Sequence, residues 1–64
     1  MAKYDIEVNL SGEDGNSFMI LGRVRRALRK AGVSDEEIAE FSEDATSGDY
    51  DHLLQTCMKW VEVT

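Results

Sequence analysis

The stretch that decides the fold is Tyr4-Asp5-Ile6-Glu7-Val8-Asn9-Leu10, followed at once by Ser11-Gly12-Glu13-Asp14-Gly15-Asn16. Apolar and polar residues alternate through the first segment, and this period of two predicts a strand with one buried face. The second segment is rich in residues that favour chain reversal, so it predicts a tight turn that ends the strand. A new element is therefore expected to begin near Ser17.

From Ser17 onward the apolar residues recur at intervals of three and four, which predicts a helix. The residues expected to face the core are Phe18, Leu21, Val24, Leu28 and Ala31. Gly32 occupies the position just past the expected helix end. Gly22 lies inside this helix, where glycine costs about 1 kcal/mol relative to alanine, so a close approach of another backbone is expected there.

Two further helices are predicted downstream. Ser34-Asp35-Glu36-Glu37 is a capping box, in which the Ser34 hydroxyl accepts from the Glu37 amide while the Glu37 carboxylate reaches back. The apolar stripe of this second helix is Ile38, Phe41 and Ala45, and the pattern stops at Thr46-Ser47-Gly48. Asp49 or Asp51 can cap a third helix, whose expected buried side is Tyr50, Leu53, Leu54 and Cys57, with Met58 or Trp60.

The chain is expected to end in a strand, because Trp60-Val61-Glu62-Val63 alternates and is β-branched. The predicted fold is α+β, a single domain over residues 1–64 with the order β-α-α-α-β and a small sheet of the two terminal strands packed on three short helices. Both a parallel and an antiparallel pairing of the strands are compatible with these patterns. A two-stranded sheet is marginal alone, so a symmetric homodimer that joins the sheets of two copies is also predicted.

The composition limits the disulfides, metal sites and cofactors that the chain can hold. With 64 residues the core must be thin, and Cys57 and His52 are the only cysteine and histidine. One cysteine excludes an internal disulfide and favours a reducing compartment, so the cytoplasm is expected. One cysteine and one histidine cannot form a zinc cluster, and no metal or other cofactor is expected. The N-terminal residues resemble neither a signal peptide nor a membrane span.

Charge is divided unevenly along the chain. The formal net charge is −6, yet six basic residues face four acidic ones through Gly32, whereas one basic residue faces nine acidic ones from Val33 onward. The overall acidity disfavours direct binding to nucleic acid or to an anionic membrane, since both require concentrated lysine and arginine. A basic protein surface is the expected partner.

The acidic half suggests where such a partner would bind. Eight carboxylates fall within the seventeen positions from Asp35 to Asp51, with no basic residue between them. The residues expected to form a binding face are Asp35, Glu36, Glu40, Glu43, Asp44, Asp49 and Asp51. Such a row can imitate nucleic-acid phosphates and occupy a basic groove on a nucleic-acid-handling host protein. The alternative interpretation is an ordinary solvated acidic face.

The first helix offers a second hypothesis. Arg23, Arg26 and Lys30 lie close to one helical face and could bind an anionic nucleotide between subunits. Alternatively, these cations form a solvated helix face that pairs with the acidic second helix of the same molecule or of its dimer mate. The glycine-containing turn before the helix matches neither the P-loop nor the dinucleotide-binding spacing.

Catalysis is not expected. Cys57 occupies a core position, and His52, the only candidate base, points about 140° away from it on the same short helix. Asp49 and Asp51 resemble a calcium loop in spacing only, because further acidic ligands at the required offsets are missing, so helix capping accounts for them. The chain is therefore predicted to bind without catalysing.

Three segments together resemble a known group of proteins: Leu10-Ser11-Gly12-Glu13-Asp14-Gly15-Asn16-Ser17-Phe18, then Leu21-Gly22-Arg23, then Thr46-Ser47-Gly48-Asp49-Tyr50-Asp51-His52-Leu53-Leu54. The group consists of short proteins encoded by bacteria and their phages. The resemblance implies no activity and no site residues. By analogy with other small phage proteins, it raises the expectation of an inhibitor of host defence.

Overall fold

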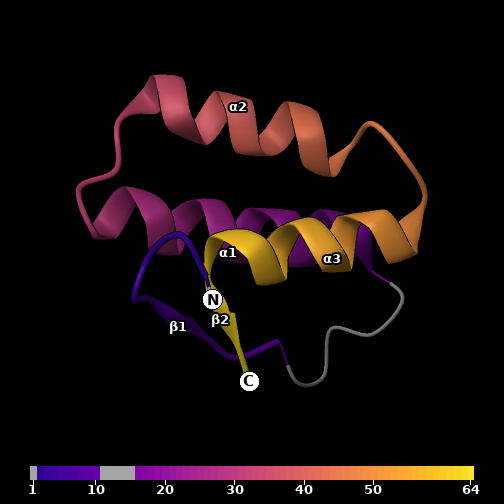
Figure 1. The fold of residues 1–64 in the computed structure, drawn as a ribbon, viewed down its shortest axis with the longest axis horizontal. Coiled ribbons are helices and arrows are strands. Elements are labelled where there is room, and N and C mark those ends of the chain that lie inside the picture. The colour runs from indigo at the N-terminus through magenta and orange to yellow at the C-terminus, as the bar shows by residue number, and fades with distance from the viewer. Residues whose placement is uncertain (1, 11–15) are drawn as a thin grey trace.

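The computed structural model describes residues 2–10 and 16–64, and within them it confirms the α+β fold and the predicted order of elements (Figure 1). The elements are β1 Glu7–Val8, α1 Ser17–Lys30, α2 Asp35–Ala45, α3 Tyr50–Trp60 and β2 Glu62–Val63. The turn predicted over residues 11–15 lies outside the described residues. Trp60, expected in the last strand, is the final residue of α3 instead.

Each helix begins at a side chain that accepts a backbone N–H, as short polar residues do at this position. The side-chain oxygen of Asn16 accepts from the Met19 amide at 3.1 Å, and Ser34 Oγ accepts from the Glu37 amide at 3.3 Å. Of the two candidates for α3, Asp49 is the cap, because its Oδ1 accepts from the His52 amide at 2.9 Å. The predicted starts of α1 and α2 are thereby confirmed.

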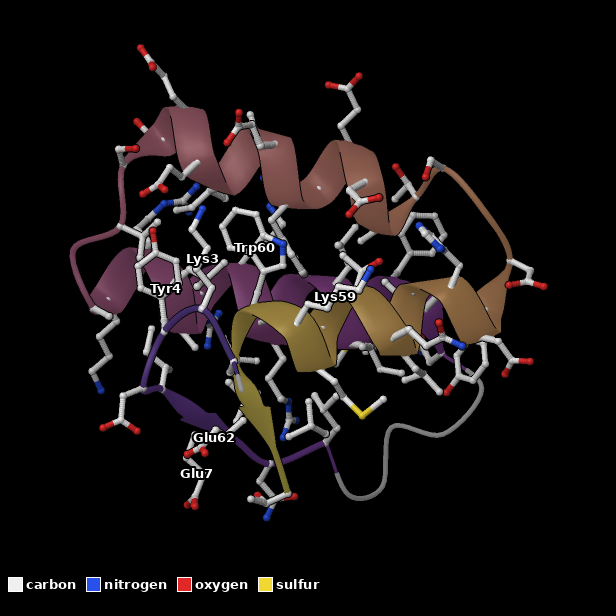
Figure 2. All side chains as sticks on the ribbon, in the orientation of Figure 1. Lys3, Tyr4, Glu7, Lys59, Trp60 and Glu62 are labelled. Carbon is white, nitrogen blue, oxygen red and sulfur yellow. The ribbon has the colours of Figure 1, made fainter. Side chains whose placement is uncertain are left out.

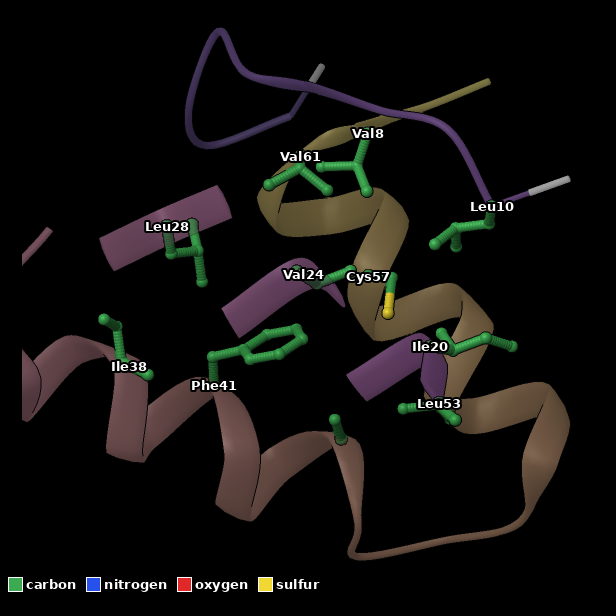
Figure 3. Close-up of a cluster of buried hydrophobic side chains, with 11 residues drawn as sticks. Val8, Leu10, Ile20, Val24, Leu28, Ile38, Phe41, Leu53, Cys57 and Val61 are labelled. Carbon is green, nitrogen blue, oxygen red and sulfur yellow. The ribbon is translucent and has the colours of Figure 1, made fainter. Parts of the chain in front are cut away.

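Three helices and the sheet enclose one core (Figure 3). Its buried members are Val8, Leu10, Ile20, Val24, Leu28, Ile38, Phe41, Ala45, Leu53, Cys57 and Val61. The stripe predicted for α1 was partly wrong: Ile20 is buried, whereas Phe18 is 86% exposed and Ala31 is exposed. Four consecutive apolar residues, 18–21, stand at the start of α1, so the spacing alone did not determine which of them face the core. Packing selects Ile20, which lies four residues before Val24.

The predicted buried side of α3 is largely confirmed. Leu53 and Cys57 are buried and Leu54 is half-buried, and of the two alternatives at the end of the helix Trp60 is half-buried whereas Met58 is 55% exposed. The sequence missed Thr56, which is fully buried and whose hydroxyl donates to the carbonyl of His52 at 2.8 Å. This internal hydrogen bond satisfies the Thr56 hydroxyl and makes its burial tolerable.

The two strands pair in parallel, with Glu7 opposite Glu62 and Val8 opposite Val63. Three helices joined by short loops cross the molecule in alternating directions and return the chain to the side where β1 begins (Figure 1). β2 must therefore run in the same direction as β1. The strand predicted over Tyr4–Leu10 is assigned only at Glu7–Val8, although hydrogen bonds continue beyond it, including Tyr4 N–H to the Trp60 carbonyl at 2.9 Å.

Candidate functional site

The acidic face consists of the seven carboxylates predicted from the sequence, and all seven are exposed. On α2 these are Asp35, Glu36, Glu40, Glu43 and Asp44, and at the start of α3 they are Asp49 and Asp51. At 100° per residue, Glu36, Glu40 and Glu43 fall within an arc of roughly 60°, opposite the buried stripe of α2. The core contacts of Ile38, Phe41 and Ala45 thus direct these acids into solvent.

Two members of the acidic face have local partners. Asp49 caps α3, and the Asp44 carboxylate lies 3.2 Å from Nε2 of His52. His52 is half-buried and turns back to the end of α2, where its Nε2 also contacts the Asp44 carbonyl at 2.8 Å and Ser47 Oγ at 3.2 Å. These contacts join the second and third helices.

The other five acids remain in solvent. Within residues 2–10 and 16–64, no side-chain hydrogen bond or ion pair involves Asp35, Glu36, Glu40, Glu43 or Asp51. Nor does the described chain contain an ion pair between Arg25, Arg26, Arg29 or Lys30 and any carboxylate of α2. The pairing of α1 with the acidic helix, the alternative left open by the sequence, is therefore not formed by these four cations.

Glu37 behaves differently from its neighbours on α2. Its carboxylate was predicted to complete the capping box, but it accepts a short hydrogen bond from the Tyr4 hydroxyl and pairs with Lys3 Nζ at 3.2 Å. The segment before β1 supplies both donors, and a charged ammonium outcompetes a backbone amide for the carboxylate. The Tyr4 hydrogen bond, followed by that of Lys3, lowers the pKa of Glu37, and the same Tyr4–Glu37 bond raises the pKa of Tyr4.

An aromatic cluster, which sequence reasoning missed, extends this contact (Figure 2). Lys3 Nζ lies 4.3 Å from the centroid of the Trp60 ring, within cation–π range. Trp60 stacks beside Tyr4 at 6.0 Å between centroids and meets the edge of Phe41 at 5.6 Å. Through these contacts the N-terminal segment packs against the start of α2 and the end of α3. Its members are far apart in sequence, so no local pattern signals it.

The basic side of the molecule lies along α1. Arg23, Arg26 and Lys30, predicted to share one helical face, all line a single groove of about 780 Å³ between α1 and β1. Nη1 of Arg23 donates to the backbone carbonyl of Asn9 at 3.0 Å across this groove. The structure thus brings the three predicted cations together in the groove between α1 and β1. In Figure 1, α2 and β1 lie on opposite sides of α1.

Gly22 lines the same groove and contradicts the expectation of a close backbone approach. A Cβ placed on Gly22 would meet no atom of residues 2–10 or 16–64 within 4 Å, so no contact in this part of the chain requires glycine there. Gly32, in contrast, adopts a φ of 90°, as predicted for the residue past the helix end.

Nucleophilic and metal chemistry have little structural support in the described chain. Cys57 is fully buried, and burial raises the pKa of its thiol to about 11, so the nucleophilic thiolate is scarce. Among residues 2–10 and 16–64, no three His, Cys, Asp or Glu side chains gather closely enough to hold a metal ion. In the same residues, no helix has the length and apolarity needed to cross a membrane.

Comparison with protein-family models finds no match, and neither the curated proteins nor the solved structures include a significant match to this chain.

Proposed function

We propose that this chain is a non-catalytic, cytoplasmic interaction module whose acidic face binds a basic protein surface, of the kind that otherwise holds nucleic acid. The observation that supports it best is the state of the five solvent-facing carboxylates, which have no hydrogen bond or ion pair within residues 2–10 and 16–64. A face already neutralised by its own cations would have little charge left to offer a partner.

The charge density of α2 supports imitation of a nucleic acid. Its 11 residues include five of the acids in the acidic face. At 1.5 Å per residue the helix is roughly 16 Å long, so it presents about one negative charge per 3 Å. A single strand of duplex DNA presents one charge per about 3.4 Å of axis. A basic groove that accommodates one phosphate strand would therefore meet a similar linear charge on α2.

A pair of triple variants of equal net charge tests the proposal. Glu36→Lys, Glu40→Lys and Glu43→Lys together reverse the acidic face, whereas Asp5→Lys, Glu7→Lys and Glu62→Lys reverse three exposed acids near the sheet. Proteins retained from host lysate by the wild type should be lost with the first variant, retained by the second, and displaced by added duplex DNA. Equal loss with both variants would show that net charge alone governs capture, and the proposal would be wrong.

One observation favours a second candidate, the binding of an anionic nucleotide. Arg23, Arg26 and Lys30 share one groove, so a phosphate in it would meet several cations at once. A nucleotide that binds only the folded state at 100 times its Kd would stabilise the protein by about 2.7 kcal/mol, which thermal unfolding detects readily. The acidic-face hypothesis predicts no shift with nucleotides.

A further inference from the structure

Among the described residues, β1 pairs with β2 along one edge only, and its other edge forms one wall of the groove between α1 and β1. The amides of Glu62 and Thr64 donate to the carbonyls of Ile6 and Val8, at 2.8 Å and 2.9 Å, so these alternate residues of the β1 segment use their backbone groups on β2. In a parallel ladder the intervening residues direct their N–H and C=O groups to the opposite edge. The backbone groups of Glu7 and Asn9 therefore face the groove, which both residues line.

One contact already shows this edge in use. The guanidinium of Arg23 donates to the Asn9 carbonyl at 3.0 Å, at the position where the N–H of a neighbouring strand would donate. An entering strand would replace this hydrogen bond with a backbone one and turn the guanidinium toward the ligand. The edge thus accepts hydrogen bonds from within the groove.

The opposite wall, on α1, is shaped for an extended backbone with acidic side chains. Gly22 contributes no side chain, and the space above it is open. Arg23, Arg26 and Lys30 flank it, while the exposed side chains of Phe18 and Met19 form an apolar end. Glycine inside a helix costs about 1 kcal/mol, and no contact in the described fold explains its presence here.

We propose that this groove binds an extended acidic segment of a partner protein as a third strand, on the edge of β1 opposite to β2. Backbone hydrogen bonds to Glu7 and Asn9 hold the segment, as in other cases of strand addition to a sheet edge. Side chains that alternate along the segment face α1, where acids meet Arg26 and Lys30 and an apolar residue meets Phe18 and Met19. The site is independent of the acidic face on α2.

Charge distinguishes this occupant from a second copy of the chain. If two copies paired antiparallel through β1, about a two-fold axis perpendicular to the sheet, both α1 helices would lie on the same face of the joined sheet, and the cations that line each groove would face those of the other copy. Like charges so placed oppose association. A nucleotide, for its part, has no repeating backbone to match the strand edge, so it would use the cations alone.

Selection from a random peptide display library on the intact chain at low salt tests the proposal. We expect enriched sequences in which acidic residues alternate with others, and a synthetic peptide of the enriched sequence serves as the probe for affinity measurements. Glu7→Pro removes the outward N–H of Glu7 without touching a hydrogen bond to β2, since proline is tolerated on an edge of this kind. We expect Glu7→Pro to raise the Kd of the peptide by about tenfold or more. Glu7→Gln, which keeps the N–H, should bind the peptide as tightly as the wild type does.

A second matched pair tests the cations. Arg26→Glu reverses a residue that lines the groove, and Lys59→Glu, at an exposed position on α3, changes the net charge by the same amount outside it. Arg26→Glu should raise the Kd of the peptide by about tenfold. The control variant should leave the Kd nearly unchanged, because an exposed charge outside the groove is screened. If circular dichroism shows that Glu7→Pro does not fold, this second pair of variants still tests whether the groove binds the peptide.

Three results would overturn the proposal. One is an enriched peptide that lacks alternating acids or binds Glu7→Pro as tightly as the wild type. Another is a nucleotide that stabilises the wild type and Glu7→Pro equally and displaces the peptide, which would assign the groove to anions held by α1 alone. The third is a wild-type dimer in light scattering that Glu7→Pro dissociates, which would assign the edge to a second copy.

Discussion

Replacing Gly22 with alanine should stabilise the protein. The new Cβ meets no atom within 4 Å, and the φ of Gly22 is not positive, so the substitution brings neither a clash nor backbone strain. What remains is the difference in helix propensity, about 1 kcal/mol in favour of alanine. For a domain of 64 residues, that corresponds to an increase in Tm of about 4–8 °C. With a urea m-value of about 1 kcal/mol/M, the midpoint of denaturation should rise by about 1 M.

Gly32→Ala is the matched control for this prediction. It makes the same chemical change next to the same helix. Gly32, however, has a φ of 90°, where a Cβ lies too close to the carbonyl oxygen of the adjacent backbone. This variant should lose about 1 kcal/mol. Urea unfolding followed by Trp60 fluorescence measures both variants. A destabilised Gly22→Ala, or a neutral Gly32→Ala, would refute the reasoning, because it would mean that the backbone and surroundings of these glycines differ from those described.

Three further outcomes follow from particular contacts. Glu62→Lys should raise the free energy of unfolding by about 0.2–1 kcal/mol, since it replaces a like-charge pair opposite Glu7 with an opposite-charge pair; the gain should shrink in high salt in urea titrations. Because the pKa of Cys57 rises from 9.0 to about 11, the thiolate population at pH 8 should be about 100-fold lower than in the unfolded chain, and alkylation followed by mass spectrometry should be slower by at least that factor. The lowered pKa of Glu37 contributes stability at neutral pH that is lost as pH falls through that pKa, so Glu37→Gln should lose less stability than the wild type between pH 7 and pH 3; an equal loss would exclude this contribution.

Local patterns in the sequence determined the elements and their order. Ser34 and the acids after it mark the start of α2, and Gly32 marks the end of α1, because capping and positive φ depend only on nearby residues. The exposure of the acidic face could also be predicted, since its spacing places it opposite the apolar stripe of the same helix. The sequence left open whether cations from α1 would neutralise it, because that depends on how two helices pack.

Tertiary structure decided everything that joins distant segments. The buried stripe of α1 passes through Ile20 rather than Phe18 because α1 packs on several elements at once, which local period cannot resolve. The Glu37 carboxylate binds Lys3 and Tyr4 instead of completing the capping box, because the fold brings these residues to it from 33 and more positions away in the sequence. The open groove beside Gly22 exists only because β1 pairs with β2 on its other edge. Residue spacing reports on neighbours within one element, and contacts between elements require the fold.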